Sequence, residues 1–275
     1  MSRGIAAFLD RCVSAVTAIQ SPRQRMKTLA RLREHIDRKG LVEIETPRGT
    51  LRFLGLRGPN PASMLARFHD DEPETLEWID TYIKPGDTVW DIGANIGAYA
   101  LYAGTIENVT VYAFEPGALN FGLMVEHLQL NRLGDRVLPI CAAFADETGI
   151  EALQIGEFSA GHTSALGDAR NQFDAFDAAF AQSVPVYTID GFRRTFSLPP
   201  PDHIKLDVDG IEGAIIAGAA ETLPQVKTLT VEVEGDNVTH AGERIDAPLL
   251  AAGFEEQPEH RGKGYGRNRL YVRPG

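Results

Sequence analysis

The stretch 87-DTVWDIGANIGAYALYAG-104 decides the fold, together with 110-TVYAFEPGA-118 just after it. An apolar run leads into a glycine-containing turn and then into a helical pattern, the order found at the ligand-binding end of an open α/β sheet. Asp91 stands where the first glycine of a G-x-G-x-x-G dinucleotide loop would stand. A dinucleotide would bring its pyrophosphate close to this acid, which is unfavourable. The stretch therefore predicts a ligand without phosphate.

Asp91 favours a ligand that carries cationic groups, and S-adenosylmethionine has both an ammonium and a sulfonium. Gly93 and Gly97 allow a tight turn and a close approach of the backbone, and a helix expected to begin near Asn95 presents free N–H groups. Glu115 follows about 20 residues later, at the end of the next expected strand. It is placed to accept hydrogen bonds from both ribose hydroxyls.

Short apolar runs alternate with helical patterns and predict an α/β fold with a doubly wound, mostly parallel sheet. The expected parallel strands are 88–92, 109–114, 137–141, 203–208 and 228–233. The runs 254–257 and 269–272 are too close together for a helical crossover, so the last strand is expected to be antiparallel. Residues 151–183 are interpreted as an irregular lid or substrate-facing insertion, with a helical candidate at 171–181.

Residues 1–75 are expected to form an appendage, and residues 76–275 the ligand-binding domain. Apolar spacing predicts a helix that ends before Ser21 and a second from Arg23 to about Lys39, and 41–55 alternates as a β-hairpin would. The helical pair is expected to pack on the protein or to self-associate into a homo-oligomer, rather than to contact a membrane surface.

The formal charge of −11 argues against nucleic acid as a partner, because phosphate backbones are bound by clustered Lys and Arg. Cys12 and Cys141 lie far apart and have no ligand-spaced neighbours, so neither a disulfide framework nor a zinc site is expected. Asp10 and Arg11 interrupt the apolar N-terminus where a signal peptide needs an unbroken run, and no run reaches spanning length. These features predict a cytoplasmic protein without stable membrane insertion.

Several separated stretches together resemble the FkbM-type family of S-adenosylmethionine-dependent methyltransferases. They are 84-KPGDTVWDIGANIGAYA-100, 113-AFEPGALNF-121, Asn131, 184-VPVYTIDGF-192 and 202-DHIKLDVDGIEGAIIAGA-219. The resemblance implies a class I, Rossmann-like methyltransferase fold and a hydroxyl of a sugar, lipid or secondary metabolite as the acceptor. It also implies cofactor contacts around the methionine part, the ribose and the adenine, by Asp91, Gly93, Ala94, Asn95 and Gly97, by Glu115 with Pro116, and by Ala143.

Methyl transfer to a hydroxyl requires that the hydroxyl lose its proton, so a base or a metal ion such as Mg²⁺ is expected beside the acceptor. Asp207 is the first candidate, and Asp209 stands close by where the family usually has Glu. Glu212 and Glu232 are weaker candidates, and the competing interpretation pairs one of these acids with Lys205. His162 is a second possible base, although a lone loop histidine is more often solvated.

The stretch 260-HRGKGYGRNR-269 concentrates positive charge in an acidic chain. Because the preceding strand is expected to run parallel to the others, this loop should open on the cofactor rim. Arg261, Lys263 and Arg267 are therefore candidates for binding an anionic group of the acceptor, with Arg267 as the bidentate partner. The alternative is a solvated hairpin loop.

Two other functions remain open on the sequence. A nicotinamide-dependent dehydrogenase would share the sheet, but it predicts a third glycine and no acid at position 91. A nucleoside-binding scaffold without turnover would show the same binding residues and differ only in lacking activity.

Overall fold

The computed structural model describes residues 2–156, 164–166, 180–208, 210–233 and 237–275. Its centre is a seven-stranded sheet with the order β12-β13-β11-β10-β3-β4-β5. The strands are β3 Thr88–Ile92, β4 Thr110–Phe114, β5 Val137–Ile140, β10 His203–Leu206, β11 Thr228–Glu232, β12 Glu255–Glu256 and β13 Asn268–Val272. β13 pairs antiparallel with both β11 and β12, and β3, β4, β5, β10 and β11 run parallel. The predicted α/β class I fold and its antiparallel last strand are confirmed.

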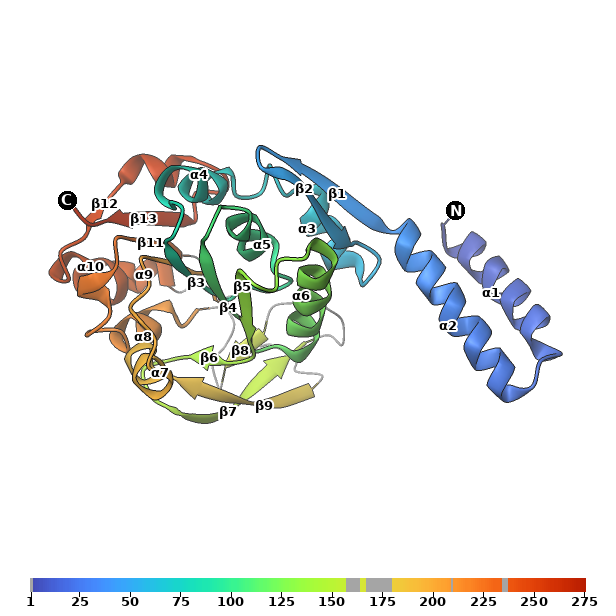
Figure 1. Ribbon diagram of the computed structural model, residues 1–275. Helices are drawn as coiled ribbons and strands as arrows, with labels where there is room; N and C mark the ends of the chain where they lie inside the picture. The colour runs from blue at the N-terminus through green and yellow to red at the C-terminus, as the bar shows by residue number, and fades with distance from the viewer. Residues whose placement is uncertain (1, 157–163, 167–179, 209, 234–236) are drawn as a thin grey trace.

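Helices cover both faces of this sheet and enclose two hydrophobic cores (Figure 1). Trp78, Leu101 and Met124 belong to one core, and Trp90, Phe114 and Ile215 to the other. The covering helices are α4 Pro73–Tyr82, α5 Ala98–Gly104, α6 Ala118–Asn131, α7 Ile189–Phe196, α8 Glu212–Ala217, α9 Asn237–Ala241 and α10 Ala247–Ala251. Shorter helical turns lie at Leu223–Gln225, Gly242–Asp246 and Pro258–Gly262.

The N-terminal region begins with two helices, α1 Ser2–Ala18 and α2 Pro22–Lys39. Ser21 caps α2 in a reciprocal pair with Gln24, Pro22 occupies the first turn, and Gly40 ends the helix, as the sequence indicates. The hairpin of β1 Leu41–Thr46 and β2 Gly49–Leu54 follows, then α3 Pro59–Ala66. These predicted helices and the hairpin are confirmed.

The hairpin and α3 pack into the same core as α4 and α5, through residues such as Phe53 and Leu65. Asn131 at the end of α6 exchanges hydrogen bonds with the backbone of Arg52 at 2.6 and 2.8 Å. Residues on both sides of position 75 therefore pack in one core. The division into two domains at this position stays a prediction.

Residues 151–183 differ from the expected irregular insertion. Their two ends belong to β7 Gly149–Ile155 and β9 Phe180–Tyr187, which pair antiparallel in a second sheet with β6 Ala143–Phe144 and β8 Ser164–Leu166. One face of this sheet is buried, because Leu153 and Ile155 of β7 and Val184 and Val186 of β9 alternate with half-buried residues and pack in one cluster. The helix expected at 171–181 is wrong at its end, where Phe180 and Ala181 are in β9, and its remainder lies outside the described residues.

Candidate functional site

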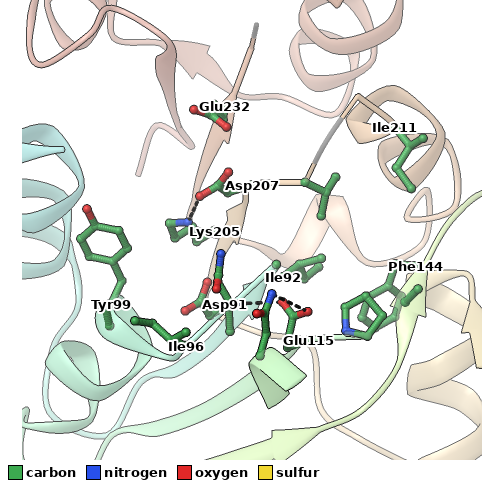
Figure 2. A pocket seen from close by; sticks show the side chains of 18 of the residues that line it. Asp91, Ile92, Ile96, Tyr99, Glu115, Phe144, Lys205, Asp207, Ile211 and Glu232 are labelled. Atoms are coloured by element: carbon green, nitrogen blue, oxygen red, sulfur yellow. Dashed lines mark hydrogen bonds and ion pairs between the residues drawn. The ribbon is translucent and has the colours of Figure 1, made fainter. Parts of the chain in front are cut away.

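A cavity of about 450 Å³ opens at the carboxyl ends of β3, β4, β10 and β11, beside the point where the strand order reverses. Figure 2 shows Ile96 and Tyr99 on one side of Asp91 and Glu115, and Phe144 and Ile211 on the other. Seven of the eight predicted cofactor residues line it, namely Asp91, Gly93, Ala94, Asn95, Glu115, Pro116 and Ala143. The eighth residue, Gly97, does not line the cavity and lies against Met124 and Leu101 of the core.

The turn after β3 depends on backbone conformations that favour glycine. Gly93 has φ +86°, and a Cβ there would lie 1.8 Å from the carbonyl oxygen of Asp207. Gly97 has φ +84°, and its Cβ would press on Met124 and Leu101. Because Asn95 also has a positive φ, of 51°, the helix begins at Ala98 and not near Asn95 as expected. The turn is three residues longer than the sequence suggested.

Asp91 is a buried carboxylate, and its Oδ1 has no hydrogen-bond partner among the described residues. It lies in register with Lys205 of the neighbouring strand. Burial raises the pKa of Asp91 to about 6, against the attraction of Lys205 and with a further increase from Asp207. A buried acceptor without a donor is costly unless a ligand supplies one. The side chain of Asn95 presents a second such atom, Oδ1.

Glu115 is buried at the end of β4 and is held by backbone donors. Its Oε2 accepts from the N–H of Asn95 at 2.9 Å, and its Oε1 accepts from the N–H of Gly117 at 2.8 Å. The side chain of Asn120 also donates to Oε1, at 3.5 Å. These donors fix the carboxylate at the wall of the cavity, and a carboxylate can accept about four hydrogen bonds, so a ligand hydroxyl can also donate to it. The two loops that follow β3 and β4 are thus joined by the residue predicted to bind ribose.

The wall beyond Glu115 is mostly apolar. It is formed by Ala142, Ala143, Phe144, Leu153, Leu166, Val208 and Ile211. Phe144 packs edge-on against Phe114 at 4.8 Å between ring centroids, which fixes its position. The faces of a flat aromatic ring would suit this part of the cavity.

The opposite end of the cavity is charged. Lys205 is buried and donates to Asp207 at 2.5 Å, with its ammonium 5.3 Å from the centre of the Tyr99 ring (Figure 2). Burial opposes the charge on Lys205, but the carboxylate of Asp207 outweighs it and raises the pKa of Lys205. Burial likewise acts against ionised Asp207, and Lys205 more than compensates, holding the pKa of Asp207 below its usual range. The interpretation that pairs Lys205 with an acid is confirmed.

Glu72 also lines this charged end, just before α4. Burial raises its pKa to about 7, with Lys205 opposing that shift and Asp207 adding to it, and its Oε2 accepts from Thr75 Oγ1 at 2.8 Å. The sequence analysis missed Glu72. An acid ahead of a helix is common for helix capping, and only the folded chain brings this one to the sheet.

Of the three basic candidates in the loop 260–269, one lines the cavity and two do not. Arg267 lines the cavity and lies 3.8 Å from Glu232, and its guanidinium is 5.3 Å from the centre of the Tyr265 ring. Arg261 instead pairs with Glu256 and Lys263 with Glu77, and neither lines the cavity. Their placement beside an acceptor is not supported, because nearby acids of the edge strand and α4 hold them outside.

His162 and Asp209 lie outside the described residues. Glu232 lines the cavity, whereas Glu212 does not. Glu212 begins α8, as the competing interpretation expected. Over the described ranges, no three His, Cys, Asp or Glu side chains are grouped so that they could hold a metal ion. The Mg²⁺ considered from the sequence therefore has no support here.

Residues 91–256 match the Methyltransferase FkbM domain. The chain belongs to this methyltransferase family. Hexuronic acid methyltransferase AglP of Haloferax volcanii is 27% identical over 173 residues, 62% of this chain and 63% of that protein. The 31-O-demethyl-FK506 methyltransferase FkbM of Streptomyces tacrolimicus is 40% identical over 73 residues, 26% of this chain and 27% of that protein. The chain thus matches less than two thirds of the length of either relative.

Solved structures of similar shape include a putative rRNA methylase from Clostridium thermocellum. It has a TM-score of 0.46 and 13% identity over 74% of this chain and 95% of that one. A precorrin-6y C5,15-methyltransferase from Geobacter metallireducens has a TM-score of 0.41 and 16% identity over 68% of this chain and 72% of that one.

One stretch within the matched residues serves the fold instead of the cavity. Thr188 caps α7 by accepting from the N–H of Gly191 at 2.9 Å. Asp190 accepts from the backbone N–H groups of Glu221 and Thr222 at 2.8 and 2.9 Å. The motif 184-VPVYTIDGF-192 therefore fastens α7 to the segment after α8.

Across the described helices, none is both long and apolar enough to cross a bilayer.

Proposed function

We propose that this FkbM-family protein is an S-adenosylmethionine-dependent O-methyltransferase that acts on a hydroxyl of a sugar or secondary metabolite. The observation that carries the proposal is the pair Asp91 and Glu115, two buried carboxylates at adjacent strand ends, one with an oxygen that lacks a donor. The names of the relatives support the acceptor class, since one gives a hexuronic acid and the other a demethylated oxygen.

The residues of the cavity fit this cofactor. Asp91 Oδ1 would accept from the ammonium, Glu115 from the ribose hydroxyls, and the apolar wall with Phe144 would cover the adenine. When bound, the cofactor supplies an activated methyl group on a sulfonium. The charged end of the cavity would then remain for the acceptor, where Glu72, Tyr99 and Lys205 lie.

Glu72 is the residue we propose as the base. Its pKa of about 7 matches a group that must both take and release a proton near neutral pH. Asp207 is a poorer base, because, despite burial, Lys205 lowers the pKa of Asp207 and so weakens its affinity for a proton. Asp207 would instead orient the acceptor hydroxyl. With the cofactor bound, Glu72 would take the proton of the acceptor hydroxyl, which would leave that oxygen able to accept the methyl group that the sulfonium supplies.

Cofactor affinity is expected to fall as the pH drops below about 6, because protonated Asp91 cannot balance an ammonium. The Asp91→Asn variant should bind S-adenosylmethionine more weakly by about 1.5–3 kcal/mol, roughly ten- to a hundredfold, at neutral pH. Its affinity should also lose this pH dependence. Calorimetry across the pH range measures both effects, and an equally pH-dependent affinity in the variant would remove Asp91 from the ammonium site.

Turnover is expected to fall as the pH drops through about 7, where Glu72 becomes protonated. With saturating cofactor, Glu72→Gln should lower kcat by about a hundredfold or more and abolish this inflection. The Kd for S-adenosylmethionine should change little. The matched control is Glu77→Gln, an exposed acid of α4 outside the cavity, whose profile should equal that of the parent.

The proposed activity itself is tested by incubating the protein with methyl-labelled cofactor and hydroxylated probes, beginning with free glucuronic acid. Label in an alkali-stable ether supports methylation of a hydroxyl, whereas label that alkali releases as methanol identifies a methyl ester on the carboxyl group and contradicts a hydroxyl acceptor. Tight cofactor binding with no transfer to any probe favours the nucleoside-binding scaffold.

A further inference from the structure

The N-terminal arm, defined here as α1 and α2, stands away from the rest of the protein (Figure 1). No residue of α2 is buried, and Thr17 is the one buried residue among the described side chains of α1. The sequence had suggested that these helices pack on the protein or on a second copy. The first alternative holds near the end of α2, where Asp37 pairs with Arg57 at 3.3 Å. Over the rest of their described residues, both helices present broad exposed faces.

One face of α1 is apolar and exposed. Its large side chains recur at helical spacing and form a stripe, and their exposed fractions lie between 56% and 92%. They are Ile5, Phe8, Leu9, Val16 and, just past the helix, Ile19. An apolar stripe of this length is unusual on a solvent-facing helix and indicates a binding surface.

The arm is also strongly basic. Residues 1–40 contain nine Lys and Arg against three Asp and Glu, although the whole chain has a net charge of −11. Arg23, Lys27 and Arg31 recur every fourth residue on one exposed face of α2. The structure records no carboxylate beside these three among the residues that it describes. Their charge is therefore available to an anionic partner.

We propose that the arm docks the protein on an anionic lipid surface. The stripe of α1 would bury itself at the boundary between headgroups and acyl chains, and the basic side chains of α2 would lie among the lipid phosphates. Both features are needed for reversible docking, since an apolar stripe and local positive charge each contribute part of the affinity. The remainder of the chain is acidic and would be held off the surface.

A second copy of this chain fits the arm less well. Each arm carries nine basic residues against three acidic ones, so pairing two arms would bring like net charge together, which is repulsive. The acidic body of another copy would attract the arm, but its exposed apolar side chains, such as Ile150, Phe196 and Val238, belong to separate elements. Over the described residues they offer no stripe to match that of α1.

Vesicle flotation with the full chain tests the proposal. The probes are vesicles of phosphatidylcholine alone and vesicles that also contain about 30% phosphatidylglycerol. The parent should bind the anionic vesicles at least about tenfold more strongly, and salt should weaken this binding. Phe8→Ser with Leu9→Ser should abolish it, and Arg23→Gln, Lys27→Gln and Arg31→Gln together should reduce it by about tenfold or more.

The matched control is Ile150→Ser, an equally exposed apolar residue of the body, which should bind as the parent does. Circular dichroism and cofactor affinity should be unchanged in all variants, because the substituted side chains lie outside both cores and the cavity. No binding to anionic vesicles, or binding that survives Phe8→Ser with Leu9→Ser, overturns the proposal. A dimer that dissociates in this variant, with no vesicle binding by the parent, would assign the arm to a second copy.

Discussion

Replacing Gly93 with alanine is expected to abolish binding of S-adenosylmethionine. The added Cβ would lie 1.8 Å from the carbonyl oxygen of Asp207, so either the turn after β3 or the end of β10 must move. Both segments line the cavity, and the positive φ of 86° adds strain of about 1–3 kcal/mol. Calorimetry should detect no binding at cofactor concentrations that saturate the parent, and the melting temperature should also fall.

Gly86→Ala is the matched control for this loss. Gly86 has a similar φ of 91°, but no atom lies within 4 Å of the position that its Cβ would take. This variant should show the stability cost of the backbone strain and retain cofactor binding. If Gly93→Ala bound the cofactor as tightly as Gly86→Ala does, the turn after β3 would not form the binding site.

The protein is expected to lose stability in mild acid because of His127. This side chain is fully buried in α6, where Nε2 accepts from the N–H of Leu54 at 3.0 Å and Nδ1 lies 2.9 Å from the carbonyl oxygen of Ile96. The ring must therefore be neutral, with its proton on Nδ1. Through these two bonds His127 joins the hairpin to the turn after β3. Burial lowers the pKa of His127 from 6.5 to about 4.

Between these two values the unfolded chain takes up a proton at this histidine and the folded chain does not. The stability that neutral His127 contributes is complete above pH 6.5 and is lost as the pH falls toward about 4. Over the full window the loss is about 3 kcal/mol. Urea unfolding at several pH values measures it.

His127→Gln should be less stable than the parent at neutral pH and should lack this part of the acid sensitivity. His69→Gln, at an exposed position, should keep it. Equal slopes of stability against pH in the parent and in His127→Gln would show that His127 does not titrate as its surroundings require.

The sheet and the cofactor turn could be predicted from sequence because their signals are local. Apolar runs such as 88–92 and 228–233 are buried on both faces, and Asp91, Gly93 and Glu115 each follow or end a strand. The parallel arrangement then brings these three residues together without further information. The family motifs identified the same edge of the sheet.

The remaining features depend on contacts between distant segments. Glu72 reaches the cavity only because the start of α4 lies at the carboxyl end of the sheet, and no local pattern marks it. His127 looks like one polar residue in a helix, although it bonds to Leu54 and Ile96 from other elements. The same cause explains why Lys263 does not line the cavity, since its partner Glu77 lies far away in sequence.

Titration calorimetry with S-adenosylmethionine, S-adenosylhomocysteine and NAD, on the parent and on Asp91→Asn, tests the central claim most directly. The parent should bind S-adenosylmethionine and its product S-adenosylhomocysteine and show no heat with NAD, and Asp91→Asn should weaken binding of the first two. Binding of NAD, or binding of S-adenosylmethionine that Asp91→Asn leaves unchanged, would contradict the assignment of this cavity.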